Sequence, residues 1–142
     1  MTPTDAAALL EQFRTGKISS EKVLRAFQAA PLADLGFAQV DPHLGLRKGF
    51  GEVIYGAGKT PEQVVQIASR ILAHEQRALV TRIGPAHARA LRRKFKRAVY
   101  HEAARCVTIE NQPLPKRAGY VAVLCAGTSD LPVAEEAAVP AA

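Results

Sequence analysis

The stretch that decides the fold is EVIYGAGKTPEQVVQIASRILAHEQRALVT, residues 52–81. It begins with β-branched and aromatic residues at positions 53–55, a composition typical of a strand, and the glycines that follow end that strand. Thr60 then precedes a proline, and Gln63 stands three positions later, which is the spacing of a helix N-cap with a capping box. Apolar residues next recur at helical spacing, and residues 78–81 predict another strand. The order strand, helix, strand predicts an α/β fold.

The same alternation continues on both sides of this stretch. Residues 36–40 have the pattern of an earlier strand, Pro85 opens another helix, and residues 106–109 predict a further strand. Strands that alternate with helices along a chain favour a mainly parallel sheet with helices packed against it. We therefore expect one α/β domain over residues 31–110.

The two ends of the chain have patterns of their own. Residues 1–30 carry two short amphipathic segments separated by Gly16, which predict an N-terminal helical hairpin. Residues 111–119, NQPLPKRAG, have the prolines of a linker. Residues 120–142 read as an apolar strand, a polar turn and the start of a helix, the first strand-loop-helix of a second, Rossmann-type domain. Because a lone strand has no partner, we expect a chain that is truncated just after this domain begins.

Composition indicates a globular protein outside the membrane. Hydrophobic residues make up 48% and charged residues 23% of the chain, and no apolar run approaches the roughly 18 residues of a membrane helix. The N-terminus lacks the basic residues of a signal peptide, so we expect a cytoplasmic protein. Cys106 and Cys125 are too isolated for a disulfide framework, and we expect two buried thiols. The histidines are scattered, so we expect no metal site.

The positive charge is concentrated in one region. The formal net charge is +6, and no acid lies between Glu75 and Glu102. Such a patch suits phosphate-bearing partners, although a solvated helix face is the commoner explanation. No nucleic-acid motif is present, so we expect no specific nucleic acid as partner. On the predicted helix we expect the arginines to be exposed, and Leu91 and Phe95, on the opposite side, to be buried. The eight basic residues of the region are Arg77, Arg82, Arg89, Arg92, Arg93, Lys94, Lys96 and Arg97.

Two loops after predicted strands carry candidate binding residues. The loop GAGKT at residues 56–60 lacks the first glycine of a phosphate loop, since Val53 occupies that position. Lys59 and Thr60 at the helix start suit a single anion, or they form an ordinary cap, and the pattern leaves both open. The second loop lies at the carboxyl end of the first predicted strand, where α/β folds bind ligands. Its candidate residues are Asp41, His43 and Arg47.

The turn before the last helix is chemically the richest. Gly127 allows a ligand to approach the backbone, and the hydroxyl of Ser129 with nearby helix N–H groups suits a carboxylate or phosphate. Asp130 has a side chain that can move a proton. The alternative is that Ser129 or Asp130 only caps the helix that follows.

Several strings of this sequence resemble one family. Residues 34–41 (DLGFAQVD), 47–56 (RKGFGEVIYG) and 58–63 (GKTPEQ) resemble the N-terminal domain of the LarB family. Residues 121–137, VAVLCAGTSDLPVAEEA, are similar to the opening of that family's second domain, which itself resembles the aminoimidazole ribonucleotide carboxylase of purine synthesis. The resemblance covers nearly the whole chain beyond the first helix.

The resemblance implies a reaction in nickel-pincer cofactor biosynthesis. Family members carboxylate the pyridinium ring of nicotinic acid adenine dinucleotide and hydrolyse its phosphoanhydride, releasing AMP, with carbon dioxide or bicarbonate as co-substrate and Mg²⁺ as expected cofactor. By this resemblance Ser129 and Asp130 are catalytic and handle the carboxyl group that is added. The expected substrate-binding residues are Gly127, Thr128, Asp41, His43, Arg47, Lys59 and Thr60.

The resemblance also bears on whether the chain is active. A pyridinium ring resists attack by carbon dioxide until a nucleophile has added to it, and the resemblance implies that this nucleophile is a cysteine late in the second domain. Neither Cys106 nor Cys125 matches that cysteine, so we expect this chain to be inactive alone and the full-length form to be a homo-oligomer. Two alternatives are a purine-pathway carboxylase-like protein and a non-catalytic nucleotide-binding or assembly module.

Overall fold

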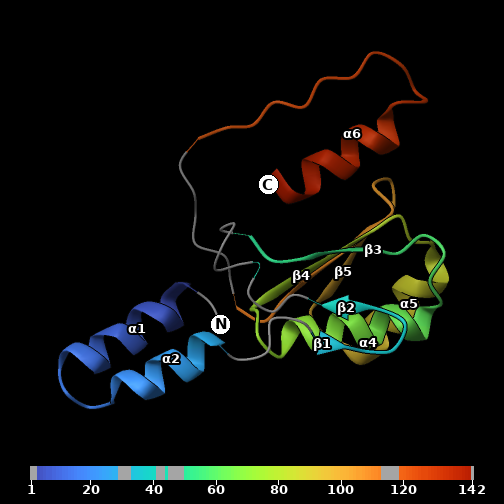
Figure 1. Ribbon diagram of the computed structural model, residues 1–142. Coiled ribbons are helices and arrows are strands. Elements are labelled where there is room, and N and C mark those ends of the chain that lie inside the picture. Colours follow the sequence, from blue (N-terminus) through green and yellow to red (C-terminus); the bar gives the residue numbers. More distant parts are fainter. Residues whose placement is uncertain (1–2, 29–32, 41–43, 45–49, 113–118, 142) are drawn as a thin grey trace.

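The centre of the protein is a four-stranded sheet with two helices on one face (Figure 1). The computed structural model describes residues 3–28, 33–40, 44, 50–112 and 119–141. The predicted α/β class is confirmed. In spatial order the strands are β3 (Val53–Tyr55), β4 (Arg77–Thr81), β6 (Cys106–Glu110) and β5 (Ala98–His101), and the helices are α4 (Pro61–Leu72) and α5 (Pro85–Lys94).

The sheet is mixed rather than mainly parallel. Strands β3 and β4 are parallel and are joined through α4, with Ile54 opposite Val80. Strand β6 pairs antiparallel with both β4 and β5. The difference arises because the sequence pattern did not reveal β5. This strand is followed by a turn over residues 102–105, which is far too short for the crossover that a parallel neighbour would need.

The hydrophobic core lies between the sheet and the helices α4 and α5. Alternate residues of β4 and β6 face it, including Val80 and Val107, both with no exposed surface. Val64 of α4 and Leu91 of α5 are fully buried against them, as the helical spacing predicts. Phe95, which we expected to be buried, is only partly buried, because it follows the last residue of α5 in extended backbone.

The segment predicted as one strand at residues 36–40 is instead a tight hairpin. Its strands are β1 (Ala33–Asp34) and β2 (Gln39–Val40), which pair antiparallel. Between them the N–H of Leu35 donates to the carbonyl of Ala38 at 2.9 Å, and Gly36 has a φ of 80°. Glycine adopts this left-handed conformation without the steric cost of a side chain, so the chain reverses where the sequence pattern suggested a continuous strand.

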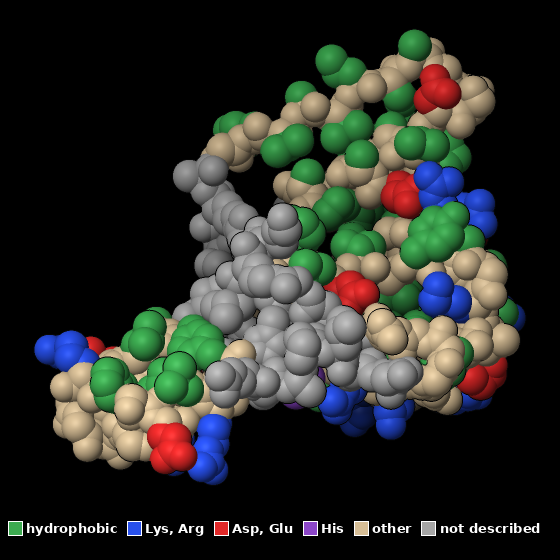
Figure 2. Space-filling model, viewed as in Figure 1, with side chains coloured by type: hydrophobic (Ala, Val, Ile, Leu, Met, Phe, Trp, Pro, Cys, Tyr) green, Lys and Arg blue, Asp and Glu red, His purple; other side chains and the backbone are tan. Residues whose placement is uncertain are grey.

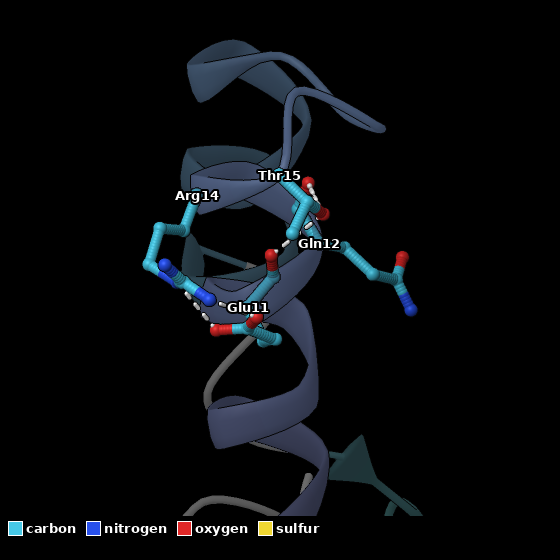
Figure 3. A network of polar contacts seen from close by, with 4 residues as sticks. All are labelled: Glu11, Gln12, Arg14 and Thr15. Carbon is cyan, nitrogen blue, oxygen red and sulfur yellow. Dashed lines mark hydrogen bonds and ion pairs between the residues drawn. The ribbon is translucent and has the colours of Figure 1, made fainter.

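The predicted N-terminal helical hairpin is present as α1 (Pro3–Arg14) and α2 (Ser20–Gln28), which pack against each other. Among the residues of these helices whose burial the structure describes, only Ala6 and Val23 are buried, so the apolar faces of α1 and α2 remain largely open (Figure 2). At the end of α1, Arg14 binds Glu11 through two hydrogen bonds of 2.7 and 2.6 Å (Figure 3). Both side chains are exposed, and such surface pairs contribute little to stability.

The C-terminal segment departs most from expectation. Helix α6 (Leu131–Ala138) forms, and a short 3₁₀ helix, Val139–Ala141, follows it. The strand predicted at residues 120–124 does not form, since residues 120–126 pair with no other described strand. A strand needs a hydrogen-bonding partner, and Tyr120 and Leu124 are almost fully exposed. Residues 113–118 of the predicted linker lie outside the described residues, and the proposed domain limits stay a prediction.

Candidate functional site

Three connections meet at one edge of the sheet, at the carboxyl ends of its parallel strands. The N–H of Gly56, after β3, donates to the carbonyl of Thr81 at 2.8 Å. The N–H of Ile83, after β4, donates to the carbonyl of Arg105 in the turn between β5 and β6 at 3.0 Å. These bonds place the loop after β3, the loop after β4 and this turn side by side. In α/β folds this edge is where ligands bind.

Lys59 and Thr60 are positioned by the first of these loops. The ammonium of Lys59 donates to the carbonyl of Tyr55 at 2.9 Å, and the carbonyl of Lys59 lies 2.8 Å from Nε2 of His87. The hydroxyl of Thr60 accepts from the N–H of Gln63, whose side chain accepts from the N–H of Thr60. The predicted capping box is therefore confirmed. Thr60 is used as a cap, and Lys59 stays close to its own backbone.

The turn at residues 127–130 lies at the start of α6. The N–H of Asp130 donates to the carbonyl of Gly127 at 3.0 Å, and the carbonyl of Asp130 accepts from Val133 and Ala134. Asp130 is thus the N-cap residue by position, but its carboxylate makes no capping hydrogen bond. Thr128, Ser129 and Asp130 are exposed. The carboxylate of Asp130 is therefore open to a solute.

An open hollow lies beside this turn. Its volume is about 490 Å³, and its lining includes Leu124, Cys125 and Asp130. Residues of the extended segment form one side and residues of α6 the other. One carboxylate thus borders a mostly apolar surface, which suits a ring-shaped ligand better than a highly charged one.

Helix α6 is tied to the sheet by a contact that the sequence interpretation missed. Nε of Arg82 lies 2.6 Å from a carboxylate oxygen of Glu136, which raises the pKa of the arginine. Arg82 directly follows β4 and has a φ of 55°, a conformation that is uncommon outside glycine. Figure 2 shows acidic and basic side chains together where α6 approaches the sheet. One sequence signal could have identified Arg82 beforehand, namely its position directly after a parallel strand.

The predicted site residues do not form one cluster in the described part of the chain. Asp41, His43 and Arg47 lie outside the described residues. No hydrogen bond or ion pair of the described residues joins Lys59 to the turn at residues 127–130. The link between the two regions is instead the pair Arg82–Glu136.

The two cysteines differ from each other. Cys106 has no exposed surface, its thiol donates to the carbonyl of Ala104 at 3.1 Å, and burial raises its pKa. A thiol in this state is a poor nucleophile. Cys125 is exposed, so the expectation of two buried thiols is wrong for this residue, because the strand that would have buried it does not form. Over the described ranges, no three His, Cys, Asp or Glu side chains gather where they could hold a metal ion.

The basic face of α5 has the predicted orientation. Arg89 and Arg93 of α5 are exposed, as is Arg97 after the end of the helix, while Leu91 lies in the core. Arg97 donates to the carbonyl of Asn111. A shallow hollow of about 310 Å³ between α4 and α5 includes Arg93 in its lining.

None of the helices in the described residues has both the length and the apolar character needed to cross a bilayer.

The sheet and its two helices correspond to a known protein family. The model of the LarB/PurE-like N-terminal domain matches residues 32–112, which include the β1–β2 hairpin, the whole four-stranded sheet, α4 and α5. A relative from Methanocaldococcus jannaschii, named Uncharacterized protein MJ0165, is 29% identical over 136 residues, which cover 91% of this chain and 53% of the relative. The chain thus spans about half the length of the curated relative it matches. The chain belongs to the LarB/PurE-like N-terminal domain family.

Proposed function

We propose that this chain is the N-terminal part of an enzyme of nickel-pincer cofactor biosynthesis. The proposed reaction adds a carboxyl group to the pyridinium ring of nicotinic acid adenine dinucleotide and hydrolyses the phosphoanhydride, releasing AMP. The observation that carries this proposal is the family match over residues 32–112. The string resembling the start of the second domain supports it, because it follows the matched region in the family's order.

The turn at residues 127–130 is the proposed catalytic element. The carboxylate of Asp130 makes no capping bond and borders the hollow beside α6. In that position it can hold or move a proton next to a carboxyl group, and the exposed hydroxyl of Ser129 can donate a hydrogen bond to the same group. The backbone at Gly127 and Thr128 is proposed to contact the substrate directly.

The dinucleotide is proposed to contact the rest of the sheet edge as well. Lys59 and Thr60 lie at the start of α4, where a helix favours an anion. Asp41, His43 and Arg47, in a loop outside the described residues, remain proposed substrate contacts by resemblance. A homo-oligomeric, cytoplasmic full-length protein is part of the same proposal.

Two small co-reactants belong to the proposal. Carbon dioxide or bicarbonate supplies the added carboxyl group. Mg²⁺ is the expected cofactor, but the described residues offer no cluster of ligands for it, and we route no step through it. Mg²⁺ commonly binds through substrate phosphates, which the dinucleotide would provide.

The nucleophile that activates the pyridinium ring must come from outside the described residues. Cys106 is buried at the start of β6, and burial raises the pKa of its thiol. Cys125 is exposed at the hollow, but it does not match the family's cysteine in position. The proposal therefore predicts little turnover by this chain alone.

Two other functions remain candidates. A purine-pathway carboxylase-like activity is favoured by the family's own description, which combines LarB and PurE. A nucleotide-binding or assembly module without chemistry is favoured by the exposure of Ser129 and Asp130, which are not held in an enclosed site.

The experiment compares two proteins. One is the 142-residue chain, and the other is the same chain continued by the second half of the Methanocaldococcus jannaschii relative. AMP release from nicotinic acid adenine dinucleotide is measured with bicarbonate and Mg²⁺. We expect release by the longer protein, loss of it in Asp130→Asn, and none by the short chain. Full activity in the short chain would show that the chemistry does not depend on residues 120–142 being packed in a second domain.

A further inference from the structure

The ion pair between Arg82 and Glu136 points to a binding site that the proposed function does not require. Arg82 lies at the carboxyl end of β4, within the parallel pair β3–β4. This is the edge at which α/β sheets bind ligands, and the loops after both strands meet there. The guanidinium is thus positioned where a ligand would be expected, on a rigid part of the fold.

The backbone of Arg82 is unusual for an arginine. Its φ of 55° lies in the left-handed region, and Arg105 across the same edge has a φ of 51°. The hydrogen bond from Ile83 to the carbonyl of Arg105 connects the two turns. A residue with a side chain is less stable than glycine in this conformation by about 1 kcal/mol. Strained residues of this kind cluster at binding sites, and here the strain fixes the direction of a cationic side chain.

The guanidinium already binds an oxyanion. Its Nε lies 2.6 Å from Oε2 of Glu136. The side chain of Arg82 remains 42% exposed. A guanidinium presents a planar set of donors that matches carboxylate and phosphate groups, so the chemistry of the pair defines the class of ligand.

The carboxylate that occupies this position belongs to a lightly packed helix, although the side chain of Glu136 itself is only 20% exposed. Helix α6 has eight residues, none of which is buried, and Leu131 and Val133 are about half exposed. The helix therefore lacks the apolar anchoring that would make it a permanent part of the core. A free oxyanion competes with a carboxylate on a lightly packed helix.

We propose that Arg82 is the anchor of a binding site for a small oxyanion, a carboxylate or a phosphate, and that Glu136 occupies this site from within the chain. Movement of α6 away from the sheet opens the site, and binding of the anion and docking of α6 exclude each other. The ligand's carboxylate or phosphate takes the place of the Glu136 carboxylate, with no covalent change. This inference goes beyond the proposed function and does not rest on it.

The test measures binding of inorganic phosphate, and separately of acetate, to variants of the 142-residue chain. In Glu136→Gln the internal competitor is lost, and we expect binding at least about tenfold tighter than in the wild type, equivalent to about 1.4 kcal/mol. The matched control is Glu135→Gln, which makes the same change of charge on the neighbouring residue of α6 and should bind like the wild type. Adding Arg82→Gln to Glu136→Gln should abolish the gain.

The binding is followed by the NMR signal of the Arg82 Nε–H group, which a distant anion on α5 would not shift. A saturable shift in Glu136→Gln supports the proposal, and phosphate and acetate titrations distinguish which anion the site prefers. Equal affinity in Glu136→Gln and Glu135→Gln, or tight binding that survives Arg82→Gln, overturns it. Glu136→Ala is a second variant that lacks the carboxylate, and alanine favours helices. If one of the two variants folds poorly, the other still decides the outcome.

Discussion

Gly56 is the position at which adding a single methyl group is expected to lower the stability of the fold most clearly. A Cβ atom at this position would lie 2.2 Å from Cγ2 of Ile83 and 2.9 Å from the carbonyl oxygen of Thr81. Ile83 is 1% exposed, so its side chain has no free space to move into. The hydrogen bond from Gly56 to Thr81 holds the two backbones together at this point. Gly56→Ala therefore forces the loops after β3 and β4 apart.

The expected cost follows from overpacking of a filled core, which is about 1–3 kcal/mol. With a urea dependence of about 2 kcal/mol per molar, a loss of about 2 kcal/mol lowers the unfolding midpoint by about 1 M. Circular dichroism in urea measures this shift. The matched control is Gly51→Ala, where the nearest atoms to the new Cβ are side-chain carbons of Glu75 at 3.8 Å. Equal midpoints for the two variants would refute the close approach of the loops at Gly56.

Three further predictions concern other parts of the fold. Thr60→Ala should lower the free energy of unfolding by about 1 kcal/mol because the capping box is lost, whereas Thr60→Ser should retain most of it, as urea unfolding will measure. Burial raises the pKa of Glu75, and its Oε1 has no hydrogen-bond partner among the residues that the structure describes. The folded state therefore holds the proton of this carboxyl more tightly, so the contribution of Glu75 to stability is fully present below its ordinary pKa of 4.5 and is lost as pH rises through the raised value; unfolding of Glu75→Gln across pH should lack this loss. Duplex DNA should bind the exposed Arg89 and Arg93 weakly and lose affinity steeply as salt rises, and tight sequence-specific binding in a gel-shift assay would contradict the enzyme proposal.

The parts of the fold that sequence could predict are those governed by local rules. The start of α4 was predictable because Thr60 and Gln63 form a capping box from side chains three residues apart. Strand β5 was not, since its residues have no clear alternation and its pairing with β6 depends on a turn ended by Arg105 in left-handed backbone. The hairpin around Gly36 was also missed, because the sequence pattern of residues 36–40 does not reveal that the chain reverses at their start, where Gly36 has left-handed backbone.

In the candidate site, too, local sequence predicts some features and not others. The exposed turn at Asp130 and the cap at Thr60 follow from local sequence. The pair Arg82–Glu136 joins residues far apart in the chain, and no spacing rule connects them. The strand predicted at residues 120–124 failed because apolar composition favours a strand only where another strand is available to pair with it.

The most direct test of the proposed function follows carbon-13 from bicarbonate into product. The chain continued by the second half of its archaeal relative is offered nicotinic acid adenine dinucleotide and, in a parallel reaction, aminoimidazole ribonucleotide. The account predicts carbon-13 in a pyridinium biscarboxylate mononucleotide, with one AMP released for each carboxyl group added, and loss of both in Asp130→Asn. Carbon-13 only in the imidazole product, with no AMP released, would contradict it.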